Sequence, residues 1–518
     1  MIKILYELYY SFKFSNHISK LGRYKIKPKK KNIIIVETHK LFGGHLGLSY
    51  VCNELVKEFS CKICLFKSNF FKNILEKFIH IILMKLNLFH YRIYKSFGES
   101  FYIYFNKINL PFNQYRKFLK KIKNKKDLQN FKIEGILYGD LIYDSFLSWE
   151  NEHTIKSFED EKFVDFFYKS IEYFYFCKSL FERYDVKCVI LSHSVYLPAI
   201  MGRIALNKNR LFFTLSLAQL VNHSKKFPYS NNYKLYKKNF LKLPKKNQNE
   251  LIKKAKIDLN KNIKGYSSEG IENLDHSPFV GTKDNAAIKK GNNLKILVAS
   301  HCFTDSPHAD GNFFFTDFYD WIEYLGKISL KTNYDWYIKP HPNPKYKKKN
   351  IDVIQNFIKK YKNFNVVNHD VSHFSYLNKI DYVLTLDGHI AEELSLFNMP
   401  IINGKPNGRF SNYNFSINPK SIKQYEKILL NLKKKKNYII EKNEVYLSHC
   451  IHHFYMNQNY LIPYHKVAKK IGDNNLNSYK ILKYWISNFN LLTHEKIIKK
   501  ISVFIKKSKK EKKFIRLN

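Results

Sequence analysis

Two separate series of short apolar runs, each ended by a polar loop and followed by a helical pattern, constrain this fold most strongly. In the first series, residues 32–36 and 186–191 predict buried strands, and each leads through a polar loop to apolar residues at helical spacing. A third strand is expected at 210–217. Strands, loops and helices repeated in this order build a parallel sheet covered by helices.

The second series begins after residue 293 and contains five more expected strands, with helical patterns between them. They are residues 295–299, 335–339, 364–367, 381–386 and 400–403. A chain of 518 residues is long enough for two α/β domains. The sequence therefore predicts two Rossmann-like domains that face a cleft, in which ligands bind at the carboxyl ends of the strands.

The pattern divides the chain into four expected segments. These are a basic N-terminal segment (1–31), a first domain (32–285) with a helical insertion at about 65–130, a second domain (290–440) and a basic helical tail (441–518). The end of the first domain is rich in Lys and Asn and low in apolar periodicity, which is typical of a connection between domains.

The formal net charge is +46, because 89 Lys and Arg face 43 Asp and Glu. Such a charge favours nucleic acid, an anionic membrane surface or acidic substrates as partners. Part of it reflects a general richness in Lys, Asn, Ile, Tyr and Phe, as an AT-rich coding sequence produces. The chain has neither an RNA-binding signature nor zinc-finger spacing, so we expect no nucleic-acid partner.

No segment has the length and apolarity of a transmembrane helix, since the most apolar stretch, 78–89, is interrupted by Lys85. The aromatic N-terminus lacks the apolar core and cleavage site of a signal peptide. It either packs as an ordinary helix or lies on an anionic membrane surface, with lysines behind it. We therefore expect a cytoplasmic protein, peripheral on the inner face of the membrane in the second case.

The clearest chemical motif is Lys339-Pro340-His341-Pro342, which directly follows an expected strand. The two prolines fix the backbone. A fixed lysine and histidine suit a phosphate group, the one as a charge and the other as a hydrogen-bond donor. We therefore place Lys339, His341 and Pro342 in a nucleotide site, with a rigid turn as the alternative.

A second motif, Asp387-Gly388-His389, follows the next-but-one strand and begins a helix. Gly388 permits a tight turn, and the helix start attracts phosphate through its free amides. Glu392 and Glu393 lie in the first helical turn, where acids also stabilise the helix. We expect one of them to bind ribose hydroxyls, and we assign all five residues to the nucleotide-sugar site.

The segment 300–311 follows the first strand of the second series and is expected to face the cleft. His301 and Asp305 are assigned to the nucleotide-sugar side. The two histidines and two aspartates of this segment match no metal template, so we expect no metal site.

The K-P-H-P motif and the later run DGHIAEELSLFNMPII resemble the donor-binding half of GT-B glycosyltransferases. More narrowly, they resemble bacterial capsule and surface-polysaccharide proteins, including Kdo transferases and GT-B sialyltransferases. The runs GILYGDLIYDSFLSW, LSHSVYLPAIMGRIAL and ASHCFTDSPHADGNFFFTDFYDWI are similar to the same capsule group. The resemblance covers mainly residues 131–215 and 294–405.

The resemblance implies a transferase that moves a sugar from a CMP- or UDP-linked donor to a growing surface polysaccharide or glycolipid at the cytoplasmic face. In these families a His-Pro motif contacts the nucleotide phosphate. The chain contains no D-x-D motif, which favours a metal-independent reaction without a further cofactor. It also lacks the acid-acid-Gly motif of the sialyltransferases, so their catalytic aspartate is not transferred.

Transfer to a hydroxyl needs a general base, which we expect from the first domain. The candidates are Asp140, His45 and His193, with Asp140 preferred because it lies in a capsule-like run. A structural role is the alternative for each. Gly43 and Gly44, which let a ligand approach the backbone, and Ser194 are expected on the acceptor side.

Three other functions remain open from the sequence. A non-hydrolysing UDP-N-acetylglucosamine 2-epimerase has the same kind of fold and a similar strand, glycine and helix with Glu residues. A teichoic-acid type polymerase that moves glycerol phosphate also uses His-Pro turns. A non-catalytic protein that binds membranes or nucleic acid through its charge belongs to a different class, and salt-sensitive RNA binding without a nucleotide effect would favour it.

Overall fold

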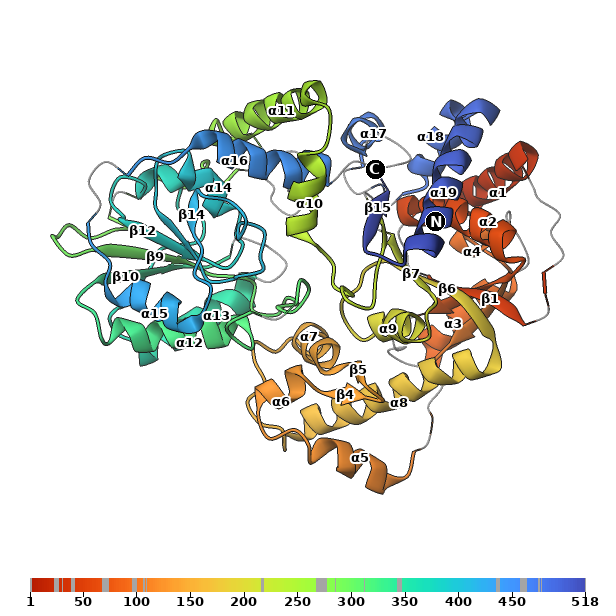
Figure 1. The fold of residues 1–518 in the computed structure, drawn as a ribbon, viewed down its shortest axis with the longest axis horizontal. Helices are drawn as coiled ribbons and strands as arrows, with labels where there is room; N and C mark the ends of the chain where they lie inside the picture. Colours follow the sequence, from red (N-terminus) through yellow and green to blue (C-terminus); the bar gives the residue numbers. More distant parts are fainter. Residues whose placement is uncertain are drawn as a thin grey trace.

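The computed structural model contains two parallel sheets, each covered by helices, and both chain ends lie beside the first sheet (Figure 1). It describes residues 2–517 apart from 23–27, 30, 39–41, 68–73, 96–99, 106–107, 109, 216–218, 267–276, 285, 312, 342–346, 435–437, 457–463, 474–475 and 477. Within these described residues, no helix combines the length and apolarity needed to cross a bilayer.

The first sheet has the strand order β15-β8-β7-β6-β1-β2-β3. Its strands are β1 (Asn32–Glu37), β2 (Lys62–Lys67), β3 (Ser100–Tyr104), β6 (Asp185–Leu191), β7 (Leu211–Leu215), β8 (Leu220–Asn222) and β15 (Ile515–Leu517). The strands from β3 to β7 are parallel and follow the Rossmann order, whereas β8 and β15 add to the edge as antiparallel strands. Helices cover both faces, which explains why the first strand is an unbroken apolar run.

The second sheet has the order β11-β10-β9-β12-β13-β14, and all its pairs are parallel. Its strands are β9 (Lys295–Ala299), β10 (Asp335–Lys339), β11 (Phe364–Val366), β12 (Tyr382–Thr385), β13 (Ile401–Asn403) and β14 (Ser416–Ile417). This is the full Rossmann order of six strands, 3-2-1-4-5-6. The two sheets confirm the predicted α/β fold with two Rossmann-like domains, which is the GT-B arrangement.

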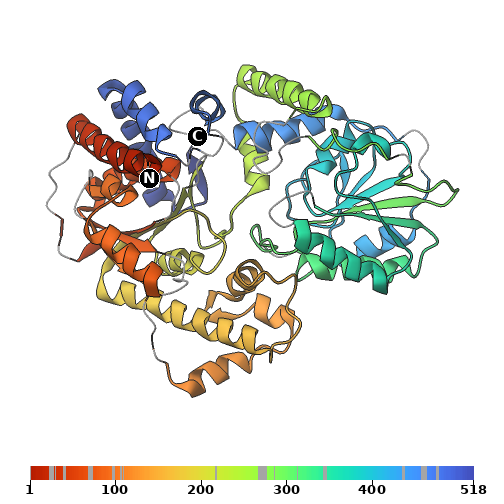
Figure 2. The same ribbon diagram turned by 180° about the vertical axis from the view of Figure 1, so that it is seen from behind.

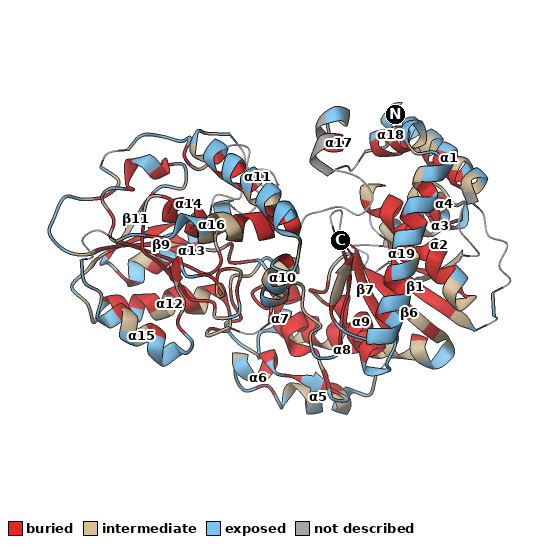
Figure 3. Cartoon of the chain, turned by 45° about the horizontal axis from the view of Figure 1, so that its top comes forward, coloured by how far each residue is buried: buried red, intermediate tan, exposed pale blue. Residues whose placement is uncertain are grey.

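Two layers of helices enclose the first sheet, and their buried faces appear red against the exposed blue faces in Figure 3. One layer contains α1 (Ile2–Gly22), α2 (Phe42–Phe59), α3 (Ile74–Lys85), α4 (His90–Lys95), α17 (Tyr464–Ile471), α18 (Lys480–Asn488) and α19 (Leu491–Glu511). The other contains α5 (Phe112–Leu119), α6 (Lys125–Gln129), the β4–β5 hairpin (Lys132–Ile133 and Ile136–Leu137), α7 (Gly139–Trp149), α8 (Glu161–Arg183) and α9 (Ala199–Asn207).

The second sheet is enclosed in the same way. One face packs on α12 (Phe318–Ser329), α13 (Lys347–Lys360) and α15 (Ile422–Leu430). The other packs on α10 (Tyr233–Phe240), α11 (Lys245–Ile263), the short 3-10 helix η2 (His373–Ser375), α14 (Ile390–Ser395), α16 (Lys442–His449) and the π-helix η3 (Cys450–Tyr455).

The hydrophobic cores around the two sheets divide the chain differently from the expected segments. Helices α10 and α11 belong to the second core, although their residues fall within the expected first domain. The expected tail is split, because α16 and η3 complete the second domain whereas α17 to β15 return to the first (Figure 2). The expected insertion at 65–130 contains β3, an edge strand of the first sheet. Helical periodicity shows that one face is apolar but not which core covers it.

Candidate active site between the two sheets

Loops at the carboxyl edge of the second sheet gather the predicted nucleotide-site residues. His301 follows β9, His341 follows β10, and Asp387 follows β12. The rings of His301 and His341 are stacked, with their centroids 6.0 Å apart. Burial lowers the pKa of both imidazoles, that of His301 to about 3, so both rings are neutral near pH 7 and offer hydrogen bonds rather than charge. Asp305 is exposed on the same loop, and Pro342 lies outside the described residues.

Lys339, the third residue predicted for the nucleotide site, is buried at the end of β10. Its ammonium group donates to the carbonyl of Val371 and lies 5.0 Å from the centre of the Tyr376 ring. Only 6% of the residue is exposed, and burial lowers the pKa of its ammonium group to about 8. Its side chain joins β10 to the loop after β11, and its assignment to a phosphate site stays a prediction.

Two cations that the sequence prediction missed, Lys405 and Arg409, follow β13. The Lys405 ammonium lies 3.2 Å from Asp310 Oδ2 and 3.4 Å from Asp387 Oδ2. Arg409 Nη1 lies 2.9 Å from His389 Nε2, and its buried Nε has no hydrogen-bond partner among the described residues. Their sequence signal is the run Gly-Lys-Pro-Asn-Gly-Arg at the carboxyl end of an expected strand, the place where ligands of this fold bind.

The turn after β12 is unusual in its backbone. Asp387 has φ of 75°, a conformation that costs free energy for a residue with a side chain and that clusters at functional sites. The amide of Gly388 donates to Thr385 Oγ1 at 3.1 Å and closes the turn. The Asp387 carboxylate lies against Gly408, where an added Cβ would stand 2.0 Å from Oδ1. Burial raises the pKa of Asp387, and the nearby Lys405 partly opposes this.

Glu392 and Glu393, which were predicted to bind ribose, have partners on the neighbouring helices, and their ribose role stays a prediction. Glu392 accepts hydrogen bonds from Ser448 at 2.5 Å and from His449 at 3.0 Å, inside the α16 layer. Glu393 accepts from Asn262 at 2.8 Å and lies 3.3 Å from His373. Both carboxylates are buried, so the acids of α14 join this helix to its neighbours α16, α11 and η2.

His389, Glu392 and His453 bring potential metal-ligand atoms within 4.8 Å of one another. The guanidinium of Arg409 adjoins His389, and His449 bridges Glu392 to Asp258 Oδ2 at 2.9 Å. Burial lowers the pKa of His449, but its two carboxylate partners raise it to about 9, so this ring is cationic near pH 7. A divalent ion here would meet two existing cations, so the group acts as a charge network in the protein interior.

A contact between the domains pairs Asp144 of α7 with His308 of the loop after β9. The distance from Asp144 Oδ1 to His308 Nδ1 is 2.6 Å, and the His308 amide donates to Asp144 Oδ2 at 3.2 Å. Both side chains are buried. Nearby, Asp317 accepts hydrogen bonds from Tyr143 at 2.5 Å and Thr154 at 2.7 Å, which fixes the same loop to the first domain.

This pair leaves one imidazole nitrogen available for chemistry. His308 Nε2 is buried and has no hydrogen-bond partner among the described residues. Burial lowers the pKa of His308, but the Asp144 carboxylate outweighs it and holds the pKa above its usual value. Burial also raises the pKa of Asp144, to about 6, despite the opposing effect of His308. An aspartate that orients a histidine whose second nitrogen has no partner among the described residues is an arrangement that suits a general base.

The three predicted bases occupy less suitable positions. Asp140 is 1% exposed and binds Arg203 through two hydrogen bonds of 2.6 and 2.7 Å, so its carboxylate is fully engaged. His45 is buried in α2 and contacts the hydroxyl of Tyr94. His193 is half-buried after β6, with Nδ1 3.1 Å from the carbonyl of Val195.

The expected acceptor-side residues are separated. Gly43 and Gly44 lie inside the first turns of α2 rather than in a loop before it. Ser194 is at the carboxyl edge of the first sheet, where its hydroxyl lies 3.0 Å from that of Ser230. Of this set, Ser194 is therefore near the loops that meet the second domain.

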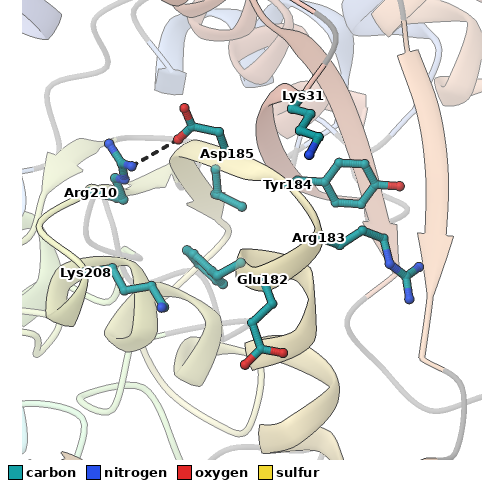
Figure 4. A pocket seen from close by; sticks show the side chains of 9 residues that line it. Lys31, Glu182, Arg183, Tyr184, Asp185, Lys208 and Arg210 are labelled. Carbon is teal, nitrogen blue, oxygen red and sulfur yellow. Dashed lines mark hydrogen bonds and ion pairs between the residues drawn. The ribbon is translucent and has the colours of Figure 1, made fainter.

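A separate pocket of about 520 Å³ lies at the amino edge of the first sheet (Figure 4). Its charged lining residues come from the end of α8, the start of β6, the α9–β7 turn and the residue before β1, and Arg210 pairs with Asp185 at 3.0 Å. They are Lys31, Glu182, Arg183, Asp185, Lys208 and Arg210. This edge is opposite the carboxyl ends of the strands, so the pocket is distinct from the candidate site.

No family model and no curated protein matches the chain. Among solved structures it is similar to KpsC, a beta Kdo 2,4 transferase from Thermosulfurimonas dismutans, with 13% identity over 51% of this chain and 79% of that one and a TM-score of 0.30. It is similar to the UDP-GlcNAc 2-epimerase of Methanocaldococcus jannaschii, with 13% identity over 80% and 97% and a TM-score of 0.20. It is also similar to the wall teichoic acid polymerase TagF, with 12% identity over 96% and 99% and a TM-score of 0.19. The fold assignment rests on the strand orders of the two sheets and not on these similarities.

Proposed function

We propose that this protein is a glycosyltransferase that moves a sugar from a nucleotide sugar to a hydroxyl of a surface polysaccharide or glycolipid. The observation that supports this most directly is the Asp144–His308 pair. It places a buried, oriented imidazole where the first domain meets the carboxyl edge of the second sheet. Asp310, two residues later, contacts Lys405, so the base and the cations share one loop.

In the proposed reaction, His308 Nε2 takes the proton of the acceptor hydroxyl as its oxygen bonds to the anomeric carbon. The Asp144 carboxylate stabilises the imidazolium that forms. The bond from the anomeric carbon to the nucleotide phosphate breaks, and the phosphate oxygen leaves with the electron pair. Lys405 and Arg409 stabilise this developing negative charge, and His341 donates a hydrogen bond to it.

The nucleotide half of the proposal is tested by thermal shift with CMP, CDP, UDP and GDP. We expect one of them to raise the Tm of the wild type, because a ligand that binds only the native state stabilises it. Arg409→Ala and His341→Ala should each weaken the binding of that nucleotide by about 1–3 kcal/mol. Arg210→Ala, which removes an exposed charge at the opposite sheet edge, is the control. Equal shifts in all four proteins would remove Arg409 and His341 from the site.

The transfer half is tested with the matching radiolabelled nucleotide sugar and polysaccharide or glycolipid acceptors. We expect the wild type to transfer radiolabelled sugar to the acceptor, and we expect His308→Ala to lose this transfer. Conversion of UDP-N-acetylglucosamine to its 2-epimer without any acceptor would instead identify an epimerase. Label from CDP-glycerol in the product would identify a glycerophosphotransferase.

Helix α1 supports a location at the membrane surface. It exposes Ile2 (71%), Leu5 (60%) and Tyr9 (50%), and Lys3 and Lys13 lie on the same helix. Apolar side chains beside lysines bind the headgroup region of anionic bilayers. We expect co-sedimentation with vesicles containing phosphatidylglycerol, reduced in a variant with Ile2, Leu5 and Tyr9 changed to Ser. Unreduced binding of that variant would exclude α1 as the contact.

A further inference from the structure

Arg516 lies in strand β15 and carries a buried charge that has no counter-ion among the described residues. Strand β15 pairs with β8 at the edge of the first sheet, and Arg516 lies opposite Val221. All three guanidinium nitrogens are covered and have no hydrogen-bond partner among the described residues. The guanidinium carbon lies 5.7 Å from the ring centre of Tyr236 in α10 and 5.8 Å from that of Tyr455 in η3. Burial lowers the pKa of the guanidinium to about 10.

A second donor beside Arg516 also lacks an acceptor. The hydroxyl of Tyr236 is buried, with 2% of the residue exposed, and donates to no acceptor among the described residues. Cation–π contacts with two tyrosines offset only part of the free energy needed to remove an unpaired charge from water. Buried polar groups in native proteins are nearly always satisfied, so donors left together without an acceptor indicate a missing acceptor.

The position of these donors connects them to the candidate active site. The rings of Tyr233 and Tyr236 are in contact, with centroids 6.4 Å apart. The Tyr233 hydroxyl lies 3.5 Å from Asp310 Oδ2, and Asp310 in turn pairs with Lys405. The guanidinium therefore lies where β15 of the first domain meets α10 and η3 of the second, two tyrosines away from the proposed donor site.

We propose that Arg516 and Tyr236 form an oxyanion-binding site, which takes a phosphate or carboxylate group. A guanidinium presents two parallel N–H donors that match the oxygens of such a group, and the Tyr236 hydroxyl supplies a third. The oxyanion belongs either to the phosphate of the nucleotide or acceptor, or to the carboxylate of an acidic sugar. The site is defined by its own donors and does not depend on the proposed transfer reaction.

The test measures Tm with and without inorganic phosphate at constant ionic strength, so it needs no turnover. Arg516→Met is compared with Lys513→Met, which removes one exposed charge from the same terminal segment. We expect phosphate to raise the Tm of the wild type and of Lys513→Met by about 2–4 °C more than that of Arg516→Met. Without phosphate, Arg516→Met should melt at a higher temperature than the wild type, because an unpaired buried charge has been removed.

Equal phosphate-dependent rises in the wild type and Arg516→Met would overturn the proposal, whatever the effect of the substitution on the protein without phosphate. Should Arg516→Met fail to fold, Arg516→Lys is used in its place, because it keeps the charge but loses the two parallel N–H donors. Less than half of the phosphate-dependent rise in Tm should remain in Arg516→Lys. Tyr236→Phe should also reduce it. The comparison is then repeated with CMP, which carries a phosphate, and with glucuronate, which carries a carboxylate. The ligand whose stabilising effect is lost in Arg516→Met identifies the source of the oxyanion.

Discussion

Replacing Asp144 by Asn changes the charge of the proposed base pair while keeping an oxygen that accepts from His308 Nδ1. In the wild type these atoms are 2.6 Å apart in a buried site, and the carboxylate holds the pKa of His308 above its usual value. A neighbouring charge of this kind shifts a pKa by about 1–3 units, or about 1.4–4 kcal/mol. In Asp144→Asn burial still lowers the pKa of His308, and only the weaker influence of the Asp140 and Asp317 carboxylates still raises it, so this pKa should fall by about that amount.

The sign of the pH effect follows from the role of the base. His308 accepts a proton only when it is neutral, so transfer by the wild type should rise with pH through the raised pKa of His308. Asp144→Asn should move this acidic limb to lower pH by about 1–3 units and lower the plateau rate about tenfold, since a weaker base remains. His308→Ala removes the base, and about 10²–10⁴-fold of the rate should be lost.

Two measurements check this prediction. The first is the initial rate of sugar transfer against pH, with the donor identified by the nucleotide screen. The second is an NMR titration of selectively labelled histidine, with the His308 signal assigned by its loss in His308→Ala. An acidic limb and a His308 pKa that are both unchanged in Asp144→Asn would refute the assignment of this pair as the base.

Two further predictions concern buried charges outside the reaction. Asp140→Asn leaves Arg203 buried beside a neutral group, so the first domain should lose about 3–5 kcal/mol of stability in urea unfolding, and adding Arg203→Met should restore most of it. If Asp140→Asn instead lost transfer activity but kept full stability, Asp140 would be the general base. His449 has a pKa raised to about 9, so its contribution to stability is complete below its unfolded pKa of about 6.5 and is lost as pH rises through about 9. The Tm should fall over this interval more in the wild type than in His449→Gln, and parallel curves would contradict the charged state of His449.

Local periodicity was sufficient to predict the fold class and eight of the strands. Each of the eight expected strands forms within one or two residues of its predicted bounds, because a buried parallel strand is a continuous apolar run that needs no knowledge of its neighbours. The same reasoning placed His341 and Asp387 at strand ends, where a Rossmann fold binds ligands. Several strands were not predicted, and β15 is one that no local pattern marks: it has three residues and is a strand only because β8 offers an open edge.

Side-chain partners depended on packing that no local pattern contains. Asp144 and His308 are 164 residues apart and meet because α7 docks on the loop after β9. Asp140 lies four residues before Asp144, one helical turn away, yet it meets Arg203 instead of the second domain. Glu392 shows the same limit, since the helix start was predicted correctly while its carboxylate turns to the histidines of α16 and η3. Periods of 2.0 and 3.6 residues specify which face of an element is buried, and the charge that meets a carboxylate there is set by the elements that close over it.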